Sequence, residues 1–247
     1  PNAQGGEIRQ AVSDLTGVPL PNIRVSFTHT HSGPTLGPTW AEGGVEMVSG
    51  YVSGLVGKVA GAVWEAFRRL QPVRISAGSG SSDINVKRRQ RLDDGRIVVG
   101  YNSEGFVDRQ VQVVKLADKE GNPVAILVNY ACHPTIMAHL NRLITPDYPG
   151  VVRRVVERTL GGTCLFLQGA AGNIGPIEGY TGDPIVYHRL GMLLGLEASR
   201  VALGLDGQAD DRTFSHVQES GAPLAIYETL ERPESDTDLR VACRTVR

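Results

Sequence analysis

Hydrophobic residues along the chain follow two spacings, and each spacing predicts one kind of element. Helical spacing of three to four residues runs through 7–15, 45–70 and roughly 186–203,. A fourth helix is expected at 149–160, with a proline in its first turn and a Gly-Gly pair directly after its end,. These four segments are the expected helices.

Runs of alternating or continuous apolar residues predict the strands. Segments 111–116 and 124–132 flank the turn "DKEGNP" and predict a hairpin whose second strand is buried,. A buried strand that breaks into a glycine-rich loop is expected over 163–173, and loops with short strands over 78–103,. Strands that alternate with helices favour an α/β fold of mixed β-sheets flanked by helices.

The chain is expected to form a single domain over its 247 residues, 1–247, in which the tail 207–247 is more polar and carries no clear pattern,. The net charge of −1 gives no indication of nucleic acid as a partner,. No apolar run reaches the ~18–20 residues that span a bilayer, so a soluble protein without a transmembrane segment is expected. Three cysteines without a CxxC motif favour a protein free of disulfides, and nothing indicates an oligomeric state,.

The segment "IRVSFTHTH" (23–31) carries two histidines at the end of an apolar alternation. Ile23, Val25 and Phe27 have the same parity as His29 and His31. Alternate side chains share one face of a strand, so both histidines are expected to continue a buried face. Imidazole is a common ligand of zinc-like metals, and two imidazoles on one face suit a metal site. The alternative is a pair of structural histidines that closes the strand.

A third histidine, His133 in "NYACHPT", also follows a predicted buried strand. Strand ends in an α/β sheet are where sites are commonly assembled, so three such histidines make a metal site as good an interpretation as three structural roles. Asp147 in "TPDYPG" is interpreted first as the N-cap of the helix at Pro149, with a place in the site as the alternative,.

The stretch "FLQGAAGNIGP" (166–176) ends a predicted strand in glycines. Backbone N–H groups at Gly169, Gly172 and Asn173 could face an anion or a developing oxyanion, and the alternative is a tight turn at a crowded strand end. The stretch is neither a Walker A loop nor a GxGxxG motif. A nucleotide- or phosphate-binding α/β protein that uses this loop stays an alternative, although no phosphate-directed lysine follows.

Two further side chains invite a chemical interpretation. Arg88 lies in the basic run "NVKRRQR", which is either solvated or supplies an arginine that clamps a carbonyl or carboxylate,. Ser32 follows the histidine pair, but the GxSxG elbow of serine hydrolases is absent, so a serine nucleophile is not favoured,.

Taken in order, six stretches resemble the neutral (non-lysosomal) ceramidase family and its bacterial relatives. They cover about residues 5–205 and read "TGVPLPNIRVSFTHTHSGP", "NVKRR", "GFVDRQVQVVKL", "NYACHPT", "ITPDYPG" and "FLQGAAGNIGP". The resemblance implies the catalytic-domain fold of that family. It also implies a Zn²⁺-dependent hydrolase that uses metal-activated water to cleave the N-acyl amide of a small-molecule or lipid substrate, and it suggests a secreted or periplasmic protein.

Position by position, the resemblance assigns unequal roles to the candidate residues. His29 and His133 match the two histidine ligands of the metal, whereas His31 matches the histidine beside the metal that helps to polarise the substrate. Arg88 matches the arginine that follows an asparagine in the active-site strand of the family.

The chain departs from the family pattern at two places. Gly175 stands where the ceramidases carry a serine in Gly-Asp-x-Ser-Pro. The remaining family ligands, a glutamate and a tyrosine, have no match in 207–247, so the chain is expected to be part of a longer protein. A non-catalytic ceramidase-like module that binds lipid or metal is therefore the alternative to an enzyme.

Overall fold

The computed structural model describes residues 2–37, 43–205 and 212–230, and the chain divides into two compact units, 1–205 and 206–247. The single domain expected over 1–247 thus differs from the observed division. Each unit builds its own sheets from its own strands.

The main sheet of the first unit has four strands in the order β1-β4-β5-β6. Their bounds are Arg74–Ser81, Gln110–Ala117, Pro123–Tyr130 and Thr163–Gln168. Strands β4 and β5 form the expected antiparallel hairpin, and β1 is antiparallel to β4. Strand β6 runs parallel to β5, which requires a crossover, and helix α3 (Tyr148–Leu160) supplies it,. The sheet is therefore mixed, as the sequence predicts.

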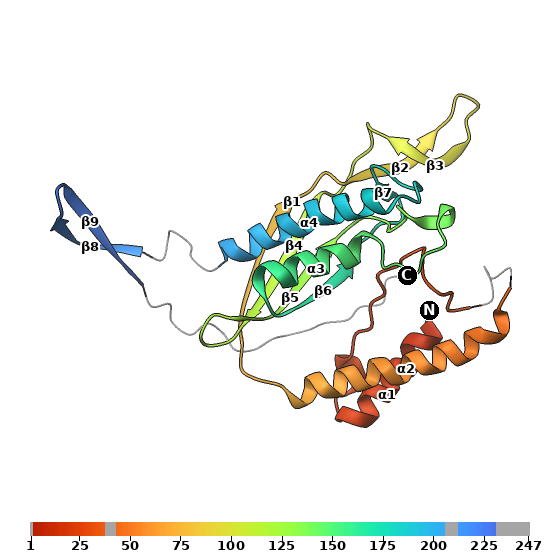
Figure 1. The fold of residues 1–247 in the computed structure, drawn as a ribbon, viewed down its shortest axis with the longest axis horizontal. Coiled ribbons are helices and arrows are strands. Elements are labelled where there is room, and N and C mark those ends of the chain that lie inside the picture. The colour runs from red at the N-terminus through yellow and green to blue at the C-terminus, as the bar shows by residue number, and fades with distance from the viewer. Residues whose placement is uncertain (1, 38–42, 206–211, 231–247) are drawn as a thin grey trace. The chain divides into compact units, whose positions relative to one another are not determined.

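Helices α3 and α4 (Pro184–Gly204) lie side by side on one face of this sheet (Figure 1). The alternation along each strand explains why they lie there, because the buried positions of β4, β5 and β6 alternate with more exposed ones and are mostly apolar,. The core between sheet and helices is built from residues that include Val111, Val113, Ile126, Val128, Tyr130, Cys164, Phe166, Leu190, Leu194 and Ala198.

A second sheet of three strands has the order β3-β2-β7. Strand β2 (Asn85–Arg91) forms a hairpin with β3 (Ile97–Asn102), and the short β7 (Ile174–Pro176) pairs with its other edge. Because β7 directly follows residues 169–173, hereafter the glycine loop, this pairing brings the loop beside Arg88 on β2. This pairing is the fold's main contribution to the site.

The N-terminal region forms two helices, α1 (Asn2–Thr16) and α2 (Val45–Arg68), which pack on each other around Ile8, Val12 and Ala60. The long amphipathic helix expected at 45–70 is confirmed. Between these helices, after a short 3-10 turn η1 (Leu20–Asn22), the strand expected over 23–31 is wrong, because these residues form no strand. His29 adopts a φ of 64°, which breaks the extended alternation,.

The second unit contains an antiparallel hairpin of β8 (Arg212–Glu219) and β9 (Pro223–Thr229). From the sequence, this region is predicted only as a polar tail, because it lacks a clear apolar alternation. The structure shows why: the two strands are exposed on both faces and need no apolar side. Cys243 lies outside the described residues. Among the helices that the structure describes, none is both long enough and apolar enough to cross a membrane.

The close contact between α3 and α4 depends on glycine. A Cβ added at Gly191 would lie 2.5 Å from Cβ of Val151 and 2.9 Å from the Tyr148 carbonyl oxygen, whereas a Cβ at Gly61 of α2 would meet no atom within 4 Å. Two helices can approach this closely only where one of them lacks a side chain at the crossing point.

We expect Gly191→Ala to lower the free energy of unfolding by about 1–3 kcal/mol, because the added methyl group forces the two helices apart. The matched Gly61→Ala change should raise it by about 0.4–1 kcal/mol, since alanine restricts the unfolded chain at a site with free space. Chemical denaturation of both variants measures the two effects. Equal changes of the same sign would contradict the packing described here.

Candidate functional site

Three histidine rings, His29, His31 and His133, lie against one another and form the histidine cluster. The ring centroids of His29 and His133 are 4.6 Å apart, and those of His31 lie 5.1 Å from His29 and 5.2 Å from His133. One ring nitrogen from each residue lies within 4.8 Å of the others. The fold therefore gathers side chains that are about 100 positions apart in the sequence.

The burial of the three residues differs from the expectation. His29 and His31 are exposed, so the prediction that they continue the buried face of a strand is wrong. The segment forms no strand, and its side-chain directions follow from its loop conformation instead. His133, directly after β5, is buried with 8% of its surface exposed. The cluster thus has a buried base and two exposed members.

The segment 28–32, the histidine segment, is held by the loop that follows His133. The N–H of His31 donates to the Pro134 carbonyl at 3.3 Å, and the N–H of Thr145 donates to the Ser32 carbonyl at 2.9 Å. The Thr30 hydroxyl donates to the Thr145 carbonyl at 2.9 Å. These bonds take the place of a strand ladder and bring the exposed histidines to His133.

Ser32 has a structural role in this arrangement. Its hydroxyl accepts a hydrogen bond of 3.0 Å from the side-chain amide of Asn141. Among the described residues, this hydroxyl donates to no histidine that could serve as a base,. The local geometry agrees with the sequence-based rejection of a serine nucleophile.

The ring of His133 is fixed in one orientation by the glycine loop. Its Nδ1 lies 2.9 Å from the Ala171 carbonyl oxygen. A carbonyl only accepts, so Nδ1 carries the proton in the neutral ring and Nε2 keeps its lone pair. Burial lowers the pKa of His133 to about 4, and the charges of Arg88, His29 and His31 act in the same direction, against the Ala171 bond. His133 is therefore neutral at pH 7 and ready to bind a cation.

Arg88 is anchored beside the cluster. Its Nε and Nη2 donate to the Gly172 carbonyl at 3.3 and 3.1 Å, and its backbone N–H donates to the Asn173 carbonyl at 2.9 Å. The pKa of His31 is lowered by partial burial, by His29 and by the positive charge of Arg88. The guanidinium is thus held by the glycine loop, and its role as a clamp on a substrate carbonyl or carboxylate stays a prediction.

The glycine loop turns its carbonyl groups, more than its N–H groups, to the site. The carbonyls of Ala171 and Gly172 accept from the side chains of His133 and Arg88. The Gly169 N–H, expected as an oxyanion donor, donates instead to the Tyr130 carbonyl at 2.9 Å. A carbonyl-lined loop repels phosphate, so this geometry disfavours the nucleotide- or phosphate-binding alternative.

Two glycines of this region differ in what they require. A Cβ at Gly169 would lie 3.0 Å from the Ala131 backbone, so the tight turn at a crowded strand end demands glycine there,. A Cβ at Gly175 would lie 3.4 Å from Cδ of Arg88, which is an ordinary contact. The missing family serine at Gly175 is thus not explained by lack of space.

Asp147 is confirmed as the N-cap of α3. Its carboxylate accepts from the N–H of Tyr148 at 2.7 Å and from the N–H of Met137 at 2.9 Å. Burial raises the pKa of Asp147, and these backbone bonds oppose that rise. Among the described residues, the group that could hold a metal contains only the three histidines. Asp147 therefore ties α3 to the loop after His133 and lies outside that group.

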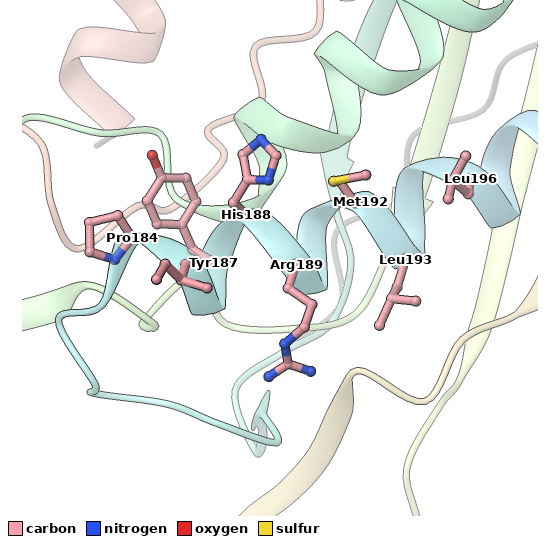
Figure 2. Close-up of a pocket in the computed structure, with 8 residues that line it drawn as sticks. Pro184, Tyr187, His188, Arg189, Met192, Leu193 and Leu196 are labelled. Carbon is pink, nitrogen blue, oxygen red and sulfur yellow. The ribbon is translucent and has the colours of Figure 1, made fainter.

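The outer face of α4 carries a separate groove of about 580 Å³ (Figure 2). Its lining is mainly apolar and includes Met192, Leu193 and Leu196, with Arg189 ion-paired to Glu178 at 2.6 Å. None of the histidines of the cluster lines this groove. This groove and the histidine cluster are therefore two different places on the described surface.

The donor set of the histidine cluster fits zinc. Imidazole nitrogen binds zinc at ~2.0–2.1 Å, which places tetrahedral ligand atoms ~3.4 Å apart. The three ring nitrogens lie within 4.8 Å of one another, so side-chain rotations of the two exposed histidines would close the remaining gap. The buried histidine already has its second nitrogen bonded to a carbonyl, as metal-binding histidines commonly do,.

Comparison with curated proteins finds neutral ceramidases. The chain is 29% identical to neutral ceramidase of Pseudomonas aeruginosa over 164 residues, which cover 63% of this chain and 24% of that protein. It is 28% identical to neutral ceramidase B of Dictyostelium discoideum over 148 residues, 57% of this chain and 20% of that protein. No protein-family model matches the chain. The matches thus span about a quarter or less of the relatives' length.

Solved structures show the same relationship at the level of the fold. A ceramidase complexed with C2 superposes with a TM-score of 0.63 at 22% identity, covering 82% of this chain and 34% of that one. The crystal structure of neutral ceramidase from Pseudomonas aeruginosa gives 0.62 at 21% identity, covering 82% and 35%. The expected ceramidase-like α/β fold is confirmed.

Sequence reasoning missed the groups that hold the cluster in place. Tyr148 and Gln168 both donate to the Cys132 carbonyl, directly before His133. In the sequence, Tyr148 reads as the start of a helix and Gln168 as the end of a strand. No local signal marks either as a partner of a peptide group far away in the chain.

The lowered pKa of His133 predicts a pH dependence of stability in metal-free protein. A histidine in the unfolded chain titrates near ~6.5, so the unfolded state takes up this proton first as the pH falls. The free energy of unfolding should therefore drop as the pH falls from about 6.5 toward 4,. From pH 7 to pH 5 this one group accounts for about 2 kcal/mol.

The measurement is urea denaturation at pH 7 and pH 5 in the presence of a chelator. His133→Asn should make the loss of stability smaller by about 2 kcal/mol, since the variant lacks the titrating group. His216→Asn on the exposed β8–β9 hairpin is the matched control and should leave the loss unchanged. A pH slope that is the same in all three proteins would refute the assignment.

Proposed function

Because part of this chain is related to the neutral ceramidases, we propose that it forms the core of a zinc-dependent hydrolase site for the amide bond of an N-acyl substrate. The observation that carries the proposal is the histidine cluster, whose three ring nitrogens lie within 4.8 Å of one another. Neutral imidazole side chains are the ligands that zinc hydrolases commonly use.

In this proposal, His29 and His133 hold the metal and His31 faces the substrate. His133 is supported as a ligand by its neutral ring and by the Ala171 bond, which directs Nε2 away from the loop. A bound zinc ion supplies Lewis-acid chemistry and lowers the pKa of water toward ~7. The side chains of the protein would set the positions of the ion and of the substrate.

The proposed role of His31 and Arg88 is to receive negative charge on the substrate carbonyl. The pKa of His31 is lowered by burial and by Arg88, so its ring is neutral at pH 7 and offers one N–H donor,. Arg88 is held by the Gly172 carbonyl through Nε and Nη2 and retains further N–H donors for a ligand,. The N–H groups of Gly172 and Asn173 stay proposed as additional donors. One well-placed donor is typically worth about 3–4 kcal/mol in the transition state.

A nucleophile derived from water also accounts for the absence of the family serine. Gly175 pairs with Val86, and a Cβ at this position would lie 3.4 Å from Cδ of Arg88. A reaction that uses water requires no hydroxyl group at this position. The proposed substrate is an N-acyl lipid or small molecule, because the relatives that match are named neutral ceramidases.

A binding module without turnover is the second candidate. The observation in its favour is that the described residues add no carboxylate to the histidine cluster. Catalytic zinc sites commonly combine three protein ligands with one open position. If His31 were the third ligand, no histidine of the cluster would remain to contact the substrate. Activity measurements separate the two candidates.

Elemental analysis of the purified protein and hydrolysis of long- and short-chain N-acyl amides test the proposal together. Wild type should carry about one zinc per chain and release the acyl group. His29→Ala should lose both the metal and the activity. His31→Ala should keep the metal but lose activity about 10²–10³-fold, as expected for removal of a charge-stabilising donor.

His139→Ala is the control, because this exposed histidine lies in the 3-10 turn η3 (Ala138–Leu140), near the cluster in sequence but outside it. It should retain zinc and activity. Purified wild-type protein that contains no zinc would contradict the proposal of a zinc enzyme. Bound zinc with no turnover of any N-acyl amide would instead favour the binding module.

A further inference from the structure

We propose that Tyr148 is a positioning residue that orients His133 through the carbonyl group of Cys132. The inference rests on the proposed function, because it treats His133 as a metal ligand. It assigns a role to a side chain that never touches the histidine cluster. The role follows from the hydrogen bonds of a single peptide group.

The peptide group between Cys132 and His133 is held at both ends. Its carbonyl oxygen accepts from the Tyr148 hydroxyl at 2.5 Å and from the Gln168 amide at 2.9 Å. Its N–H, which belongs to His133, donates to the Ile174 carbonyl at 3.1 Å. The plane of this peptide sets the direction in which the His133 side chain leaves the backbone. Three elements, α3, β6 and β7, thus fix that direction together.

The location of Tyr148 is itself fixed. Its side chain is fully buried, and its ring packs edge-on against Phe166 with centroids 5.7 Å apart. The Asp147 carboxylate caps its N–H and also accepts from Met137, which joins the start of α3 to the loop after His133. A buried hydroxyl needs a partner, and this hydroxyl donates to the carbonyl before the proposed ligand,.

Gln168 is the second donor to the Cys132 carbonyl, and this bond leaves another atom of its side chain without a partner in the described part of the chain. Its Nε2 donates to Cys132, whereas its Oε1 is buried without a hydrogen-bond partner among the described residues. An unsatisfied buried acceptor is unfavourable, so the bond from Gln168 to Cys132 comes with a penalty at the other atom of the same amide,. A purely apolar side chain at 168 would avoid the penalty and lose the bond.

Tyr130 supplies a matched comparison within the same core. Its side chain is also fully buried, and its hydroxyl donates to a carbonyl at 2.7 Å. That carbonyl belongs to Ser82, in the turn before β2, and not to the peptide of His133. Tyr130→Phe and Tyr148→Phe therefore remove equivalent groups, and only the second one touches the peptide of the proposed ligand.

The experiment measures zinc affinity by chelator competition, together with the stability of the metal-free protein. Both tyrosine variants should lower the stability. Tyr148→Phe should in addition weaken zinc binding about tenfold or more, as loss of an outer-shell partner does, and alter the absorption bands of cobalt bound in place of zinc. Tyr130→Phe should leave zinc affinity within about twofold of wild type. Equal zinc affinity in all three proteins would overturn the positioning role.

A double-mutant cycle adds a readout that a general loss of stability would not move. Gln168→Met removes the second donor to the same carbonyl with little change in volume. If both donors act through Cys132, the effects of Tyr148→Phe and Gln168→Met on zinc affinity should be non-additive. Additive effects would show that the two side chains act independently of that carbonyl.

Nitrogen NMR of the His133 ring in metal-free protein separates this inference from the proposed function. Tyr148→Phe should shift or broaden the His133 ring signals, and Tyr130→Phe should leave them unchanged. If wild type binds no zinc, the proposed function fails while this readout still decides whether Tyr148 orients the ring. Unchanged His133 signals in Tyr148→Phe would overturn the inference whether or not zinc binds.

Discussion

The hydrogen bond between the His133 ring and the Ala171 carbonyl is the interaction on which the rest of the site depends. It selects the tautomer with a free Nε2, and it joins the end of β5 to the glycine loop after β6. The same loop holds Arg88 through the Gly172 carbonyl. One short stretch of backbone therefore sets the positions of a proposed ligand and of a proposed substrate contact. The carbonyl groups of Ala171 and Gly172 favour a bound cation over a phosphate at this site.

The scaffold brings these groups together by strand pairing. Parallel pairing of β5 with β6 places the ends of both strands at one edge of the main sheet, where His133 and the glycine loop begin. Antiparallel pairing of β2 with β7 then brings Arg88 to the same edge from the second sheet. The histidine segment has no strand partner and is held by the loop from 134 to 145 instead. Among the described residues, the hydrogen bonds that attach the histidine segment to the scaffold come from this loop.

The sequence predicts well those elements whose stability is local. The helices at 45–70 and 149–160 and the β4–β5 hairpin appear as expected, because amphipathic periodicity and a turn within one segment determine them,. The strand predicted at 23–31 is wrong, because a strand requires a neighbouring strand and an alternating pattern does not show whether one exists. The tyrosine and glutamine behind Cys132 are also invisible in the sequence, since their partner is a backbone carbonyl made available only by the tertiary fold. The three histidines stand out in the sequence because each follows an apolar run, while the parity argument predicts the wrong burial for His29 and His31.

The histidine cluster is proposed as a zinc site in which the three residues have unequal roles. X-ray absorption at the zinc edge measures this most directly, because scattering from imidazole rings reports how many histidines bind the metal. We expect two imidazole ligands in wild type and two in His31→Ala, whereas His29→Ala should bind too little zinc to give an absorption edge. Loss of an imidazole in His31→Ala, or the same number of imidazoles in His29→Ala as in wild type, would contradict these unequal roles.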